Sequence, residues 1–86
     1  MMTPQEALAS TDGSIVSLQV TIRDLAKRVA DWERSLVGLE PSDPEWPAIE
    51  AERALEQRHL EERQALLGRL VEARARIQES IEKAEG

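Results

Sequence analysis

The chain has 86 residues, no cysteine, and 17 acidic against 11 basic residues, so its formal charge is −6. A chain of this length forms at most one domain and buries only roughly 60–65% of the surface that the unfolded chain exposes, so we expect self-association to contribute to its stability. The composition excludes disulfides and thiolate metal sites, has no basic block that would favour nucleic acid, and contains no apolar run near the roughly 20 residues that cross a membrane.

The first predicted element is a short N-terminal helix, followed by a turn, within residues 1–13. The Thr3-Pro4-Gln5-Glu6 sequence is typical of a capping box with proline at the first helical position. The Ser10-Thr11-Asp12-Gly13 stretch combines cap and turn residues. It predicts that the short helix ends there and that a second helix begins near residue 14.

The segment of about residues 14–39 carries an unbroken heptad pattern. Its apolar residues alternate in steps of three and four, as coiled-coil packing requires, and form a predicted hairpin seam of Ile15, Leu18, Ile22, Leu25, Val29, Trp32, Leu36 and Leu39. A β-strand does not fit this spacing because its side chains repeat every two residues. We therefore predict a helix with one narrow apolar stripe.

A turn over residues 40–44 and a long helix over about residues 45–85 follow. Pro41 and Pro44 cannot continue the preceding helix, and Ser42 or Asp43 is suited to cap the next one. The rest of the chain is dominated by residues that favour helix. Its predicted apolar stripe is broad, which is typical of a helix with two neighbours, and includes Ala48, Ala51, Leu55, His59, Leu60, Leu66, Leu67, Leu70, Val71, Ala73, Ile77 and Ile81.

Together these elements predict an all-α fold: an antiparallel, coiled-coil-like helical hairpin over residues 14–86, with a short N-terminal helix, that completes a helical bundle by self-association. Because the second hairpin helix is longer than the first, residues 72–86 are expected to extend beyond the hairpin, and either the short N-terminal helix folds back through Leu8 to cover them or another chain does. This extension and the residues before it predict an association surface made of Leu66, Leu70, Val71, Ile77 and Ile81.

One pattern has the spacing of a metal site. Glu56 and His59 form a Glu-x-x-His pair on the long helix, and Glu62 follows one turn later. With Asp31-Trp32 and the Ser42-Asp43-Pro44-Glu45 turn, this pattern resembles the encapsulated ferritins. The resemblance implies a di-iron site formed across a dimer interface. The chain departs from the family in having no glutamate at a ligand position of the first hairpin helix and no nearby tyrosine.

The sequence carries no enzyme signature. Its single histidine is not part of a recognisable nucleophile–base pair, and its isolated glycines do not form a phosphate-binding loop. The N-terminus lacks the features of a signal peptide, so we expect a cytoplasmic protein. We predict a non-enzymatic interaction module without cofactor, a dimer or tetramer that serves another protein as adaptor, assembly chaperone or inhibitor. The alternative is a ferritin-like di-iron subunit using Glu56, His59 and Glu62.

Overall fold

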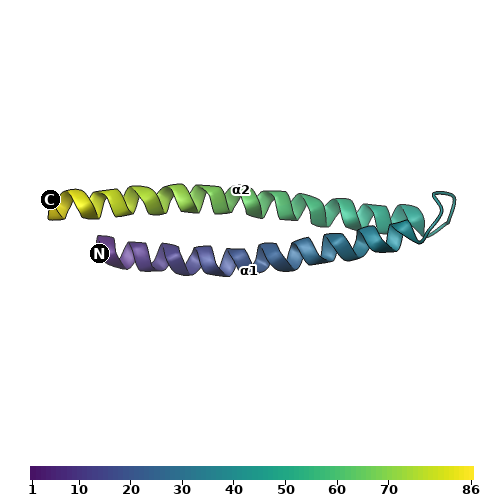
Figure 1. Ribbon diagram of the computed structural model, residues 1–86, viewed down its shortest axis with the longest axis horizontal. Coiled ribbons are helices and arrows are strands. Elements are labelled where there is room, and N and C mark those ends of the chain that lie inside the picture. The colour runs from purple at the N-terminus through teal and green to yellow at the C-terminus, as the bar shows by residue number, and fades with distance from the viewer.

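Two helices of nearly equal reach make up the whole molecule. The computed structural model describes all 86 residues and contains α1, Pro4–Val37, and α2, Trp46–Glu85, which run antiparallel side by side (Figure 1). The hairpin measures 65 × 20 × 14 Å, and its radius of gyration is 19.2 Å. A compact domain of this length has a radius of about 12 Å. The predicted all-α antiparallel hairpin is confirmed, and its shape is a rod.

The predicted short N-terminal helix is wrong, because α1 continues through residues 10–13 without a break. Thr3 does cap α1, accepting a hydrogen bond from the Glu6 backbone at 3.1 Å. Further on, the Thr11 hydroxyl donates to the Ala7 carbonyl at 2.8 Å, as threonine does inside a helix. Gly13 has no positive φ. The cap and turn residues of this stretch are therefore accommodated within a single helix of 34 residues.

The first part of α1 covers the part of α2 that was expected to extend beyond residues 14–39. Ile81 is buried, with 8% of its surface exposed, and Ile77 is half-buried. The two chain ends lie close together, and α2 reaches only a little beyond the start of α1 (Figure 1). The N-terminal residues thus form the last layers of the hairpin.

The turn is built around Asp43. Its carboxylate accepts from the backbone amide of Glu45 at 2.9 Å, and its carbonyl accepts from the amide of Trp46 at 3.0 Å. Helix α2 begins at Trp46 with Pro47 in its first turn. The amide hydrogen that proline lacks would have no partner within the helix at this position. Asp43 therefore contributes to ending the turn, although it lies before the N-cap residue Glu45.

The face of α1 toward α2 follows the heptad pattern. Leu18, Leu25 and Val29 are buried, the other five predicted seam residues are half-buried, and the pattern extends backward to Leu8 and Thr11, which are also half-buried. Leu25, Val29 and Leu60 form the central cluster, against which Ile22 packs. Burial of such side chains is the main favourable contribution to folding, at roughly 25 cal/mol per Å² of apolar surface.

The face of α2 toward α1 differs from the predicted stripe. Among the residues with reduced exposure, one row has steps of four and three, with a single step of seven after Leu60, and includes charged side chains: Ile49, Arg53, Glu56, Leu60, Leu67, Leu70, Arg74, Ile77 and Ile81. By contrast Ala48, Ala51, Leu55, His59 and Leu66 are exposed. The inner face of α2 is thus rotated away from the one that its apolar residues alone predict.

The core is small. Only five of the 86 residues are buried, and no side chain has less than 2% of its surface exposed. Two helices side by side bury one stripe each and leave the flanking positions in solvent. The hairpin therefore resembles half of a bundle in the way that it buries its residues.

Candidate functional site

Polar contacts between the helices occur where charged residues of α2 face α1. The Trp32 indole nitrogen Nε1 donates to Oε2 of Glu56 at 3.1 Å, and Nη1 of Arg28 lies 3.9 Å from Oε1 of the same carboxylate. Only 18% of the Glu56 side chain is exposed. Both carboxylate oxygens are thus engaged from α1, which explains how this glutamate faces inward.

Two further ion pairs hold charged residues near the inner face. Arg74 of α2 donates to the Asp12 carboxylate of α1. Arg53 donates two hydrogen bonds to Glu50 at 2.9 and 2.6 Å, which lower the pKa of the Glu50 carboxyl and raise the pKa of Arg53. Because the pKa of Glu50 is lowered, this pair is complete above the ordinary pKa of glutamate and is lost only as the pH falls through the lowered value.

Replacing Trp32 by phenylalanine is expected to lower the free energy of unfolding by about 1 kcal/mol, because a six-membered aromatic ring is kept while the indole donor to Glu56 is lost. Urea denaturation at fixed protein concentration measures the change. Trp46→Phe is the matched control, because Trp46 is also half-buried but its indole is not bonded to Glu56. Equal losses in the two variants would show that the hydrogen bond contributes nothing.

The residues of the predicted metal site do not converge within the hairpin. Glu56 lies on the inner face of α2 and is hydrogen-bonded to Trp32, whereas His59 and Glu62 are exposed. No three histidine, aspartate or glutamate side chains lie together in an arrangement that would hold a metal ion. A site assembled from two copies of the chain stays a prediction.

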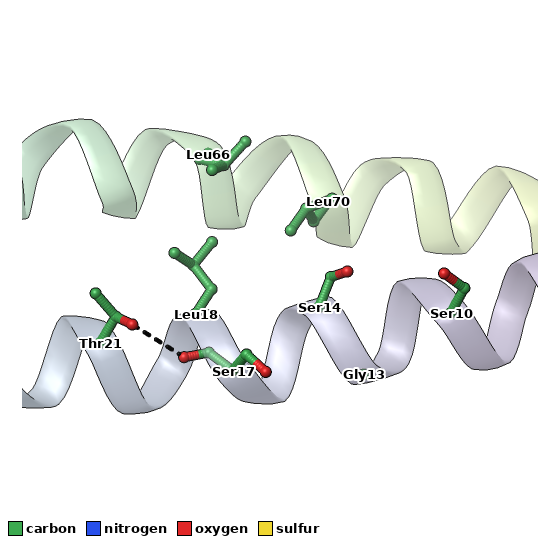
Figure 2. A pocket seen from close by; sticks show the side chains of 8 residues that line it. All are labelled: Ser10, Gly13, Ser14, Ser17, Leu18, Thr21, Leu66 and Leu70. Carbon is green, nitrogen blue, oxygen red and sulfur yellow. Dashed lines mark hydrogen bonds between the residues drawn. The ribbon is translucent and has the colours of Figure 1, made fainter.

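The largest concave feature is an open groove along one side of the hairpin, between the first half of α1 and the part of α2 that carries Leu66. We call it the serine groove, and its volume is about 740 Å³. Figure 2 shows the small side chains of α1 beneath two leucines of α2, with Leu18 pointing between the helices. The groove is lined by Ser10, Gly13, Ser14, Ser17, Leu18, Thr21, Leu66 and Leu70.

The predicted association surface is only partly accessible. Leu66 and Val71 are exposed, at 37% and 50%, whereas Leu70 and Ile77 are half-buried and Ile81 is buried against α1. Further exposed apolar side chains lie outside the predicted set: Val16, Val20, Val37 and Leu55. Exposed apolar side chains on an extended hairpin suggest that it binds a protein partner.

Neither protein-family models, curated proteins nor solved structures give a significant match to this chain. Neither helix has an apolar stretch that would cross a bilayer. The site must therefore be interpreted from its own geometry.

Sequence reasoning missed the serine groove. Ser10, Ser14, Ser17 and Thr21 recur in steps of four, three and four, which places them on one side of a continuous helix. The sequence shows this spacing if the helix is taken to continue through Gly13. The groove thus depends on the same continuity of α1 that local turn chemistry obscured.

Proposed function

We propose that the protein is a non-enzymatic interaction module, in which hairpins associate into a helical bundle that serves another protein as adaptor, assembly chaperone or inhibitor. The observation that carries this proposal is the small core, in which five residues are buried while six valine and leucine side chains remain exposed. Pairing with further helices buries such flanking residues, as in four-helix bundles. Association therefore supplies the burial that one hairpin lacks.

Sedimentation equilibrium at micromolar concentration tests the first part of the proposal. We expect a mass that is a multiple of the 9.6 kDa chain, and a helical content that falls on dilution because association stabilises the folded chain. A fully helical, thermally stable 9.6 kDa monomer at all concentrations would contradict it. Affinity capture with the tagged full chain, followed by mass spectrometry, then identifies the protein that the bundle binds.

A further inference from the structure

We propose that a second copy of this chain docks in the serine groove in antiparallel orientation, so that the two α2 helices pack against each other around Leu66. This inference rests on the proposed association of hairpins and specifies its geometry. Three observations carry it: the shape of the groove, the separation of charge along the side that contains it, and the position of Leu66 between the two charged halves.

The groove is shaped to admit another helix. Its floor on α1 consists of serine, glycine and threonine residues, and Leu18, Leu66 and Leu70 form its apolar wall. Small side chains let a neighbouring backbone approach closely, and the leucines supply the apolar surface that such packing buries. Leu66 is the most exposed leucine of this wall, at 37%, so a second copy would cover it.

Charge is separated along this side of the molecule. Arg69 and Arg76 lie on the same side of α2 as Leu66, because they follow it by three and ten positions. They lie in the half of α2 toward the chain ends, where the α1 side of the groove carries uncharged serines. Both are exposed, and neither forms an ion pair within the hairpin.

The half toward the turn carries acidic residues instead. On α2, Glu62 and Glu52 lie four and fourteen positions before Leu66. On α1, Asp24 and Asp31 continue the helical spacing of the groove residues that ends at Thr21. Two basic residues lie among these four acidic ones: Arg28, beside Glu56, and Arg58, eight positions before Leu66. Glu62, Glu52 and Asp24 are exposed and form no ion pair within the hairpin.

This separation selects one orientation of the second copy. In an antiparallel pair with a twofold axis near Leu66, Arg69 of each chain lies opposite Glu62 of the other, and the leucines meet between the two pairs. In a parallel pair with the turns together, α2 would lie on α1 of the partner. Glu62 would then face Asp24, because both lie at the same level of the hairpin, and the like charges would repel.

Charge reversal tests the proposed contact. We expect Arg69→Glu and Glu62→Arg each to raise the dimer dissociation constant about tenfold, because each replaces two attractive pairs by two repulsive ones. The double variant should return to within about threefold of the wild type, because both pairs are restored with opposite sign. Sedimentation at low salt measures all three constants. Unchanged dissociation constants in the single variants would overturn the proposal.

Arg23→Glu and Gly68→Ala are matched controls on the opposite side of the hairpin. Each lies two positions from a groove residue, Thr21 or Leu66, and two positions correspond to about 200° around a helix. Both variants should keep the wild-type dissociation constant. If these variants dissociated while the Arg69→Glu dimer stayed intact, the interface would lie on the opposite side of the hairpin. The docking geometry would then be wrong, whereas the proposed association of hairpins would still hold.

A distance measurement tests orientation directly. The chain has no cysteine, so Lys83→Cys gives one attachment point per chain for a spin label. In the antiparallel dimer the two labels should lie about 50 Å apart, since seventeen residues on either side of Leu66 each add about 1.5 Å. A distance under about 20 Å would show parallel packing and overturn the proposal. A labelled protein that is monomeric throughout would contradict the association itself.

Discussion

Replacing Gly13 by proline is expected to destabilise the hairpin by about 3 kcal/mol or more. Position 13 lies in the interior of α1, where proline removes the amide that bonds to the carbonyl four residues earlier and its ring clashes with that carbonyl. Break of α1 at this point would also uncover Ile77 and Ile81. Urea denaturation followed by circular dichroism measures the loss.

Gly13→Ala is the matched control and should have the opposite sign. A Cβ at this position meets no atom within 4 Å, and alanine favours helix over glycine by up to about 1 kcal/mol. If both variants were as stable as the wild type, residues 10–13 would form a turn between two helices. The pair of variants thus separates the continuous helix from the prediction that local sequence favours.

Replacing Leu60 by alanine should lower the free energy of unfolding by about 3 kcal/mol. Leu60 is 8% exposed and belongs to the central cluster with Leu25 and Val29, so the substitution leaves a cavity that two helices cannot readily close. Because small domains are only marginally stable, much of the chain should be unfolded at ambient temperature. Thermal melts at fixed protein concentration measure the effect.

Leu55→Ala provides the comparison within the same helix. Leu55 is 45% exposed, so its truncation should cost less than about 1 kcal/mol. The apolar pattern of the sequence places both Leu55 and Leu60 on the inner stripe, whereas in the structure only Leu60 of the two is buried. A larger loss for Leu55 than for Leu60 would contradict the observed rotation of α2.

The hairpin itself could be predicted because its signals are strong and independent. Eight apolar residues in steps of three and four, seven of them within α1, specify one buried stripe, and two prolines at positions 41 and 44 require a reversal. Neither signal depends on contacts between distant residues. For this reason the fold class followed from the sequence, while the bounds of α1 did not.

The errors arose where long-range contacts outweigh local preference. Asp12 is a typical capping residue, but in the structure it pairs with Arg74, far away in the chain. Stepping backward from Ile15 by four and three residues would have reached Thr11 and Leu8, and so would have predicted the longer helix. The sequence thus contained the signal, although the turn residues contradicted it locally.

The inner face of α2 was harder to predict. Glu56 and Arg74 occupy inward positions because Trp32 and Asp12 supply polar partners there, and a pattern of apolar residues alone assigns them to solvent. His59 appeared to lie inside for the opposite reason, since it follows apolar neighbours at helical spacing. Which charged residue faces inward depends on the partner helix, and a single sequence does not reveal that partner.

The rod is 65 Å long, and both chain ends lie at the end opposite the turn (Figure 1). Anything joined to either terminus therefore leaves from one end only, and the turn remains free. Two hairpins in opposite orientation would carry such attachments at the two far ends of a shared rod. The assembly would then act as a spacer that holds two attached groups apart rather than together.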